Sequence, residues 1–399
     1  MSILSQSQLA NSNSETESWA GKVILCVDLN AFYPSCEELR NPTLKGKPHA
    51  VIMTVIMTRQ KEDEITKGVV SSCSYEARRF GVRSAMPLSL ATSLCPNLIL
   101  RSVNISYYSQ VSKGVMKILR ECADAFEQAS IDKAFLDCTS IRGHTTPENI
   151  AMKIKERIKK ECGLLCSIGV TSTKASAKIA SDFHKPDGLT VVYPYNLTKF
   201  LFPLEVGRVA GIGAKTQERL KGLGIDTLGQ LAKADLNMLI KNFGANGRWM
   251  WTVANGRDED LVMPRGDRIS ISSENTLTVH RASRDKVLEA VDDLIDRVFE
   301  RAQAHDYLFR TVGVKIVRAD FTIETREISH LDFQNTRDSI SSVTETLVDR
   351  FSYSDDKQAI RKVGLKLSHL ISGNEYKKIK KSKKHPNQIS NKNCSDECI

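Results

Sequence analysis

The stretch Val27-Asp-Leu-Asn-Ala-Phe-Tyr33 closes an apolar run, rich in β-branched residues, that begins at Val23. Such a run predicts a buried strand, and here it ends at an acid, Asp28. A second stretch, Ser130-Ile-Asp-Lys-Ala-Phe-Leu-Asp137, places Asp132 at the middle of a strand predicted over residues 129–137. Acids on separate strands can converge to bind the divalent cations of phosphoryl transfer. Taken alone, each acid is better explained as a strand-end residue that caps a turn.

Predicted strands and helices alternate on both sides of these two acids. Helices are predicted where apolar residues recur at helical spacing, and strands where short apolar runs are rich in β-branched residues. The predicted helices are 32–39, 75–80, 107–126, 148–161 and 174–184; the predicted strands are 23–27, 50–57, 69–74, 129–137 and 165–170, with a polar loop at 60–67. This order predicts an α+β domain with a small antiparallel sheet.

The pattern changes twice in the second half of the chain. Residues 206–256 predict short helices separated by glycines. Residues 268–371 predict the order β-α-β-β-α-β, with strands at 269–279, 310–317, 321–328 and 360–370 and helices at 283–304 and 336–351. The first of these helices carries an apolar stripe for packing on a sheet: Val287, Val291, Leu294, Val298 and Ala302.

The composition indicates a basic, multidomain chain. It has 399 residues, with 57 Lys plus Arg against 47 Asp plus Glu, and a net charge of +10. This charge fits a polyanion partner such as nucleic acid and also fits a merely basic protein. Residues 374–399 hold seven lysines against three acids. Such a run can touch phosphates, but it is more often a solvated, disordered tail.

Several classes of protein are excluded by what the sequence lacks. Ten cysteines show no framework pattern, and two C-x3-C pairs have no zinc-finger partner, so we expect no zinc site. The polar residues 1–20 predict a disordered leader without a signal peptide's apolar core. No apolar run approaches the ~20 residues that span a bilayer, so we expect no membrane partner and a cytoplasmic location.

Five ordered motifs resemble Y-family (translesion) DNA polymerases of the DinB type, from about Gly21 to Ile371. Besides the two acidic stretches they are Asn41-Pro-Thr-Leu-Lys-Gly-Lys-Pro48, Ser74-Tyr-Glu-Ala-Arg-Arg-Phe-Gly-Val82 and the segment from Ile168 to Gly188. The resemblance implies a right-hand polymerase. Its parts are a ferredoxin-like palm (21–38 and 95–190), small fingers (39–94), a helix-hairpin-helix thumb (191–260), a βαββαβ little finger (268–373) and a basic tail (374–399).

The resemblance also assigns roles at the site. Asp28, Asp132 and the Leu29 carbonyl would ligate two Mg²⁺ ions, with Mn²⁺ as a substitute. Tyr33 matches the aromatic ring that excludes ribonucleotides by clashing with the 2′-hydroxyl. The incoming triphosphate would be held by Tyr75, Arg78 and Lys185.

Two further segments are expected to hold DNA. The glycine-rich segment from Val209 to Ile225 is a helix-hairpin-helix signature, in which Gly211, Gly213 and Lys215 would approach a DNA phosphate. In the last predicted strand, Lys362 and Lys366 alternate with apolar residues and would track the DNA backbone. Residues 268–373 hold 16 basic and 17 acidic residues, so only one face of this module can be basic.

The chain departs from the family at Lys133, where the family has a catalytic glutamate. An ammonium cannot ligate a divalent ion, and at ~4 Å it would repel one by several kcal/mol at an effective dielectric near 20. Three readings stay open: Lys133 turns to solvent and leaves weak activity, a nearby acid substitutes, or the protein binds DNA without synthesis. Asn30 also replaces a common but less central aspartate.

We therefore expect a template-directed, low-fidelity DNA polymerase that extends primers opposite damaged DNA. Its partners would be primer–template DNA, deoxynucleoside triphosphates and, by resemblance only, a sliding clamp; we expect a monomer associated with the nucleoid. The first rival is a Y-family-like protein that binds primer–template ends without synthesis. The second is a helix-hairpin-helix nuclease or lyase, for which the sequence near Gly211 offers no catalytic constellation.

Overall fold

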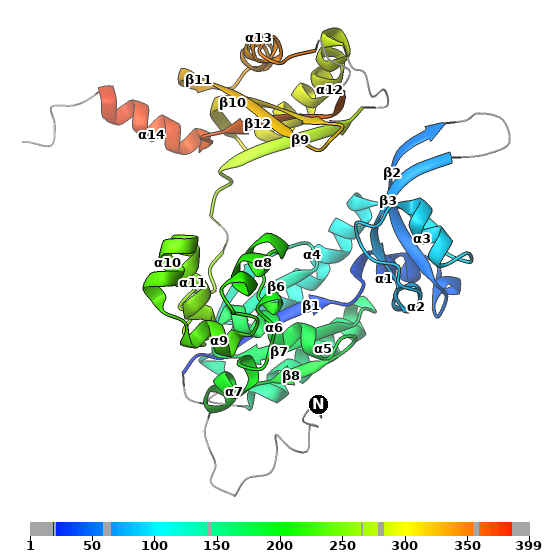
Figure 1. The fold of residues 1–399 in the computed structure, drawn as a ribbon, viewed down its shortest axis with the longest axis vertical. Helices are drawn as coiled ribbons and strands as arrows, with labels where there is room; N and C mark the ends of the chain where they lie inside the picture. Colours follow the sequence, from blue (N-terminus) through cyan, green and yellow to red (C-terminus); the bar gives the residue numbers. More distant parts are fainter. Residues whose placement is uncertain are drawn as a thin grey trace, which may run out of the picture. The chain divides into compact units, whose positions relative to one another are not determined.

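The computed structural model describes Trp19 and residues 21–58, 65–141, 145–264, 266–277, 283–353 and 359–384. The chain forms two compact units, Met1–Arg265 and Gly266–Ile399. Each unit has its own apolar core and is described by itself. Elements carry the labels of Figure 1.

A five-stranded sheet forms the centre of the first unit. Its strand order is β5 (Ala125–Gln128), β6 (Lys133–Asp137), β1 (Ile24–Leu29), β7 (Cys166–Thr171) and β8 (Leu189–Val191). Strand β1 pairs antiparallel with both β6 and β7, whereas β7 and β8 run parallel. All six side chains of β1 are buried, because helices cover both faces of the sheet.

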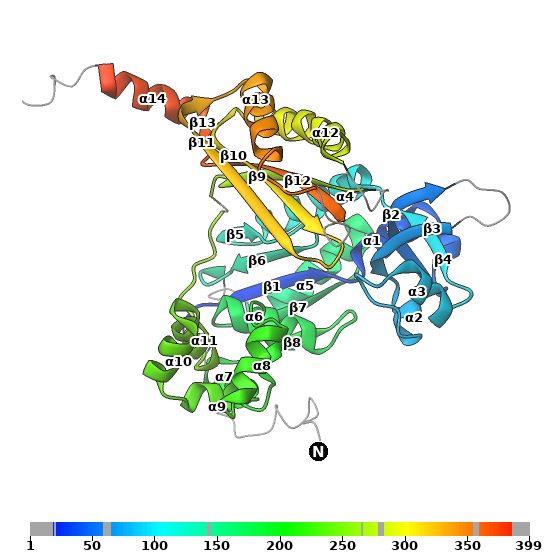
Figure 2. The same ribbon diagram turned by 45° about the horizontal axis from the view of Figure 1, so that its top comes forward.

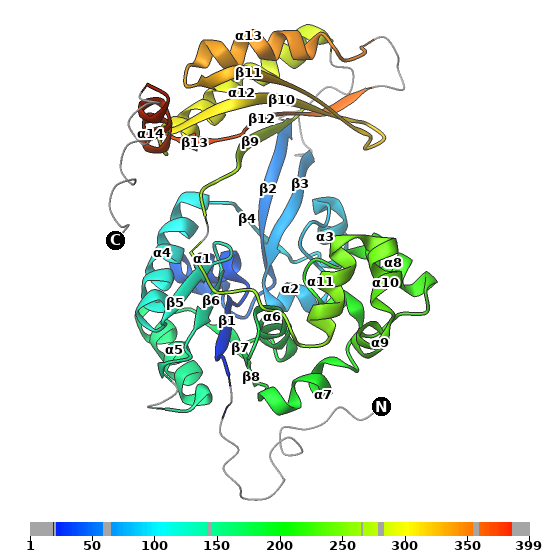
Figure 3. The same cartoon turned by 90° about the vertical axis from the view of Figure 1, so that its left-hand side faces the viewer.

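The two faces of this sheet are covered by different helices. Figure 3 shows α4 (Ile105–Glu121) and α5 (Pro147–Cys162) on one side of the strands and α6 (Lys174–Phe183) on the other. The main core includes Leu25, Val27 and Leu29, and a smaller cluster joins Ile24 and Cys26 to α6. Successive side chains of a strand point to opposite faces, so Asp28 faces α6.

A smaller three-stranded sheet has the order β3 (Ile65–Cys73), β2 (His49–Thr58) and β4 (Ile99–Ser102). It is accompanied by α1 (Phe32–Arg40), the 3-10 helix η2 (Pro42–Leu44), α2 (Tyr75–Arg79) and α3 (Leu88–Leu94). The polar loop expected at 60–67 is corrected at its end, because residues 65–67 pair with β2. Residues 59–64 lie outside the described residues. Figure 1 shows the β2–β3 hairpin extending beyond the rest of this sheet.

The first unit ends in a bundle of short helices. These are η4 (Pro194–Asn196), α7 (Leu197–Leu201), η5 (Val206–Arg208), α8 (Ala214–Gly222), α9 (Leu228–Lys233), α10 (Leu236–Phe243) and α11 (Ala245–Ala254). Leu201, Leu220, Leu228 and Leu239 are fully buried at its centre. The glycines that the sequence places between helices end or begin them here, as Gly213 and Gly244 do.

In the described residues of the second unit, four antiparallel strands and a short fifth strand form one sheet, against which two helices pack. The strand order is β11 (Ile323–Gln334), β10 (Tyr307–Arg318), β12 (Ile360–Ser368) and β9 (Ser270–Thr276). Figure 2 shows α12 (Arg284–Gln303) and α13 (Arg337–Val348) on the same side of this sheet. The five apolar residues predicted to form the stripe of α12 are buried against the sheet. The short strand β13 (Ile371–Ser372) pairs with β10.

The start of the lysine-rich tail is helical. Residues Gly373–Lys384 form α14, where the sequence favoured a disordered tail. Lys and Glu are good helix formers, and Tyr376 ties the first turn to the sheet by donating to Oδ2 of Asp332 over 2.9 Å.

Candidate active site

The carboxylate of Asp28 is the centre of a compact cluster of charges. Asp28 is only 4% exposed, at the end of the buried strand β1. Three ammonium groups contact it: Lys133 Nζ lies 2.9 Å from Oδ2, Lys178 Nζ 3.3 Å from Oδ2, and Lys185 Nζ 2.8 Å from Oδ1. Burial raises the pKa of the Asp28 carboxyl, but attraction by the three lysines outweighs burial and holds that pKa below its ordinary value.

A second acid, Asp182, connects two of these lysines. Its Oδ2 lies 2.5 Å from Lys178 Nζ and its Oδ1 lies 2.7 Å from Lys185 Nζ. Sequence reasoning missed both Lys178 and Asp182. Their i,i+4 spacing on a helix that buries its other face is the signal that could have found them.

Asp132 does not lie in the middle of a strand, and the expectation that it does is wrong. Strand β6 begins only at Lys133, because the backbone N–H groups of Ala129 and Ser130 both donate to the Lys133 carbonyl and form a turn. Asp132 sits in that turn, where its Oδ1 accepts from Ser130 Oγ over 2.5 Å. Its main-chain carbonyl accepts from the Leu29 N–H over 2.9 Å, which fixes the turn beside the end of β1.

Lys133 points into the site rather than to solvent. It is the direct partner of Asp28 in the β1–β6 register, and its side chain is 23% exposed. Burial lowers the pKa of the Lys133 ammonium, but its attraction to Asp28 is stronger and keeps that pKa above the ordinary value. In this structure Lys133 therefore does not turn away to solvent.

Among the residues that the structure describes, no neighbouring acid takes the place of the family's glutamate. Within the described part of the chain, no three His, Cys, Asp or Glu side chains gather closely enough to hold a metal ion. Both carboxylate oxygens of Asp182, the acid nearest in the ion-pair network, already accept from lysines.

Tyr75 and Arg78 lie next to this charge cluster. They belong to α2, whose first turn is capped by Ser74 Oγ. The Arg78 guanidinium lies 4.8 Å from the centroid of the Tyr75 ring, and its Nε donates to the Cys73 carbonyl over 3.3 Å. Burial raises the pKa of the Tyr75 hydroxyl, while nearby Arg78 and Lys185 act in the opposite direction. The structure thus brings together the three side chains to which the sequence assigned the triphosphate.

Asn30, at a position expected to be less central, joins the elements that carry these groups. Its Oδ1 accepts from the Asp187 N–H over 2.8 Å, in the segment that follows Lys185. Its Nδ2 donates to Ser167 Oγ over 3.0 Å and to the Tyr75 hydroxyl over 3.4 Å. An aspartate here could only accept from the Ser167 and Tyr75 hydroxyls, whereas the amide can donate to both.

Tyr33 lies in the first turn of α1, beside Asp132. Its ring stacks on Tyr108 of α4 with centroids 4.6 Å apart. Burial raises the pKa of the Tyr33 hydroxyl, and the negative charge of Asp132 raises it further. The Tyr33 ring therefore lies close to Asp132 and is held in place by Tyr108.

The expected hairpin of the helical bundle places Gly211 and Gly213 directly before α8. Gly211 has φ +109°, and a Cβ atom there would lie 2.9 Å from the Trp249 ring. A Cβ atom placed on Gly213 would have open space around it. Gly213 and Gly244 are the N-cap residues of α8 and α11, and neither caps its helix with a side chain. Lys215 is exposed in the first turn of α8.

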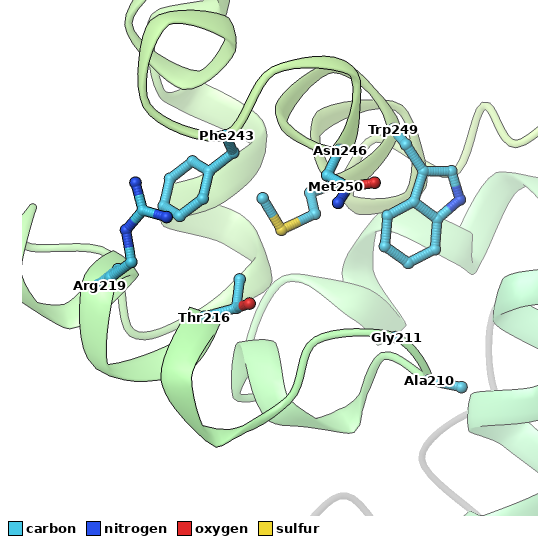
Figure 4. A pocket seen from close by; sticks show the side chains of 8 residues that line it. All are labelled: Ala210, Gly211, Thr216, Arg219, Phe243, Asn246, Trp249 and Met250. Atoms are coloured by element: carbon cyan, nitrogen blue, oxygen red, sulfur yellow. The ribbon is translucent and has the colours of Figure 1, made fainter. Parts of the chain in front are cut away.

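A second glycine hairpin at Gly244, between α10 and α11, faces the first. Figure 4 shows the pocket of about 470 Å³ between them, lined by Ala210, Gly211, Thr216, Arg219, Phe243, Asn246, Trp249 and Met250. Arg219 closes one end, because its guanidinium lies 4.7 Å from the Phe243 ring centroid and donates to the Asn242 carbonyl over 2.5 Å. Sequence reasoning missed this second hairpin, although Gly244 and Gly247 are a second pair of closely spaced glycines.

Comparison with known proteins decides the family. The sequence matches the impB/mucB/samB family over residues 27–182 and the impB/mucB/samB family C-terminal domain over residues 268–380. It is 38% identical over 352 residues to DNA polymerase IV of Methanoculleus marisnigri, a match that covers 88% of this chain and 95% of that protein. It is 35% identical over 360 residues to DNA polymerase IV of Halobacterium salinarum, covering 88% and 85%.

Solved structures agree with these sequence matches. A Y-family DNA polymerase chimera is similar with a TM-score of 0.79 and 28% identity, covering 88% of this chain and 99% of that chain. The insertion ternary complex of Dbh DNA polymerase is similar with a TM-score of 0.61 and 27% identity over the same shares. This chain belongs to the DinB-type Y-family of DNA polymerases. It is a DNA-directed DNA polymerase of the translesion class.

Membership of the Y-family implies dependence on divalent metal in general. Asp28, Asp132 and the Leu29 carbonyl offer the hard oxygen donors that such ions prefer, and Asp28 is held in its charged form. The chemistry of this donor set suits a divalent ion. The position of the family's glutamate carries the ammonium of Lys133 instead of a further oxygen ligand.

The second unit of this Y-family polymerase presents lysines on the open face of its sheet, each paired with an acid. Lys362 Nζ lies 3.4 Å from Glu274 Oε2, and Lys366 Nζ lies 2.5 Å from Glu327 Oε1. Lys315 also pairs with Glu274. The open face therefore alternates charges across its strands, and its lysines are matched by acids.

No helix in the described residues is long and apolar enough to cross a membrane.

Proposed function

We propose that this polymerase adds deoxynucleotides to a primer 3′-end at the Asp28 cluster, with low fidelity and opposite damaged templates. The observation that carries the proposal is the position of Lys185. Its ammonium contacts Asp28 and neighbours Tyr75, so the acids and the triphosphate-binding groups meet at one place. Primer–template DNA and deoxynucleoside triphosphates are the proposed substrates, in keeping with the similar insertion ternary complex.

In the proposed reaction the primer 3′-oxygen attacks the α-phosphorus of the bound nucleotide. A new O–P bond forms, the bond from the α-phosphorus to its bridging oxygen breaks, pyrophosphate leaves, and the hydroxyl proton passes to solvent. Divalent metal, Mg²⁺ with Mn²⁺ as a substitute, supplies Lewis-acid stabilisation of the developing charge. Asp28, Asp132 and the Leu29 carbonyl would hold it.

The other residues of the site bind and orient the substrate. Arg78 offers a planar fork to phosphate oxygens, and Tyr75 a hydroxyl. Lys185 exchanges its aspartate partners for phosphate oxygens when the nucleotide enters. Tyr33, stacked on Tyr108, meets the 2′ position of the sugar and rejects a hydroxyl there.

Both units bind the DNA without sequence preference. Gly211, Gly213 and Lys215 present a helix start to a phosphate, and Lys362 and Lys366 contact the backbone from the second unit. We propose a monomer in the cytoplasm, associated with the nucleoid. A sliding clamp is the proposed partner that would place the polymerase at primer ends.

A second candidate function is primer–template binding with little or no synthesis. The ion pair between Lys133 and Asp28 favours it, because that pair occupies a carboxylate oxygen that metal would need. Both candidates share the same DNA substrate, so only the measurement of synthesis separates them.

The test is single-nucleotide extension of a primer by the full chain, first with Mg²⁺ and then with Mn²⁺. We expect extension with either metal and its loss in the Asp28→Ala variant. Firm primer–template binding without extension under both conditions contradicts the polymerase proposal and supports the binding protein.

A further inference from the structure

We propose that the Lys133 ammonium takes the place of a second divalent cation, so that this polymerase works with one metal ion and one built-in lysine charge. The inference rests on the proposed function and concerns how the same site is charged. The ammonium would stand beside Asp28 and neutralise negative charge that develops at the primer 3′-oxygen.

The geometry fixes Lys133 at this place. It lies directly opposite Asp28 on the neighbouring antiparallel strand, and its Nζ is 2.9 Å from Oδ2. Strand register fixes where the Lys133 side chain emerges, which is on the same face of the sheet as Asp28 and directly opposite it. Its four-carbon stem is mostly covered, with 23% of the side chain exposed.

Lys133 also depends on Asp28 more than the other two lysines do. Lys178 and Lys185 each have a second carboxylate partner in Asp182. Among the described residues, the ion pair formed by Lys133 is the one to Asp28. If an ion displaces the three ammonium groups from Asp28, Lys178 and Lys185 keep Asp182 as a partner, whereas Lys133 has no second carboxylate in its ion pairs among the described residues.

Charge counting favours one ion over two. Asp28, Asp132 and Asp182 carry three negative charges, and Lys133, Lys178 and Lys185 carry three positive charges. A glutamate in place of Lys133 makes this set more negative by two charges. That difference equals the charge of one divalent cation, so the substitution of lysine compensates for the loss of one ion.

Among the described residues, no cluster of acids offers a second ion site. The described residues contain no group of three acids, histidines or cysteines positioned for a metal. A second ion would therefore meet an ammonium instead of a ligand.

The chemical consequence is a slower reaction that still proceeds. An ammonium stabilises negative charge on the 3′-oxygen by attraction and hydrogen bonding. It does not acidify the 3′-hydroxyl as strongly as a directly bound metal does. The Lys133→Glu variant should therefore be faster than the natural chain, and Lys133→Met slower.

The experiment counts Mn²⁺ bound to the full chain by electron paramagnetic resonance. The complex contains a primer with a dideoxy end, a template and the matching deoxynucleoside triphosphate, so no reaction occurs. We expect one Mn²⁺ per complex for the natural chain and for Lys133→Met, and two for Lys133→Glu. Lys153→Glu, on the exposed surface of α5, makes the same charge change away from the site and should leave the count at one.

Single-turnover extension by the same proteins completes the test. We expect Lys133→Met to lose about tenfold or more in rate while keeping its metal count. Two Mn²⁺ ions in the natural chain, or an unchanged rate in Lys133→Met, overturn the inference but leave the polymerase proposal standing. A natural chain that binds primer–template but neither Mn²⁺ nor nucleotide overturns the proposed function instead.

Discussion

The ring of Tyr33 stacks on the ring of Tyr108, with centroids 4.6 Å apart and an angle of 22° between their planes. Tyr108 is fully buried, and its hydroxyl donates to Glu37 Oε1 over 2.9 Å. The position of Tyr33 is therefore set by a residue 75 positions further along the chain, on a different helix. A side chain that excludes a hydroxyl by collision must be held rigidly, and this stack provides the support.

The stack predicts two ways to lose discrimination against ribonucleotides. Tyr33→Ala removes the ring and should raise the relative use of ribonucleotides by about 100-fold, close to 3 kcal/mol. Tyr108→Leu leaves the Tyr33 ring in place but without its stacking partner, and we expect an increase of about tenfold. Ratios of kcat/KM for paired deoxy- and ribonucleotides measure both effects. Tyr108→Phe keeps the stack and serves as the control; a gain in ribonucleotide use by that variant would contradict the role of stacking.

The Asn30 side chain predicts a defect in nucleotide binding. Asn30→Ala removes the acceptor for the Asp187 N–H and the donor to Tyr75, so the triphosphate groups lose their common support. We expect KM for the deoxynucleotide to rise about tenfold while kcat changes less than about threefold. Steady-state kinetics on one primer–template separate the two constants. Asn149→Ala, at an exposed position of α5, is the matched control, and equal effects of the two variants would refute the assignment.

The two hairpin glycines should respond differently to substitution. Gly211→Ala forces a Cβ atom against the Trp249 ring at a positive φ, and we expect a loss of about 1–3 kcal/mol in stability. Gly213→Ala meets open space at an ordinary φ, so we expect its stability to stay within about 1 kcal/mol of the natural chain. It should nevertheless weaken DNA binding, because the methyl group obstructs a phosphate. Thermal unfolding and DNA titration together check this, and equal stability of both variants would count against the Trp249 contact.

The ion pairs on the open sheet of the second unit predict a gain as well as a loss of DNA affinity. Lys366→Ala should weaken binding for all sequences and lower the slope of log affinity against log salt by about one. Glu327→Gln releases Lys366 from its partner and should strengthen binding. Binding isotherms at several salt concentrations measure both changes. Lys286→Ala, on the exposed surface of α12, should leave the slope unchanged; an identical change there would mean that net charge alone matters.

Glu274 predicts a pH-dependent contribution to stability. Burial raises the pKa of its carboxyl, but hydrogen bonds and attraction from Lys315 and Lys362 outweigh burial, so the pKa is lowered from 4.5. A lowered pKa means that the stabilising effect is fully present above the unfolded value and is lost as the pH falls through the folded value. Glu274→Gln should therefore destabilise the chain in urea near pH 6, and its difference from the natural chain should shrink below pH 4.5. A difference that stays constant down to pH 3 would contradict this linkage.

Local sequence determined the elements and much of the site. Apolar runs, helical spacing and glycine or proline stops predicted the strand that ends at Asp28 and the β-α-β-β-α-β order of the second unit, because these signals act within a few residues. Motifs in fixed order predicted the Y-family, which the comparisons confirm. The turn at Asp132 escaped prediction, because backbone hydrogen bonds to the Lys133 carbonyl end the strand earlier than its apolar residues indicate.

Only the tertiary structure decided which charges meet. Lys178 and Asp182 lie about 150 positions from Asp28, and their contacts depend on α6 packing across β1, which no local pattern encodes. The same holds for the amide of Asn30 and for the stack of Tyr33 on Tyr108. The sequence shows that Lys133 replaces a glutamate, but it cannot show where the ammonium goes. Strand register answers that question, because it places Lys133 opposite Asp28 in a buried site where each charge stabilises the other.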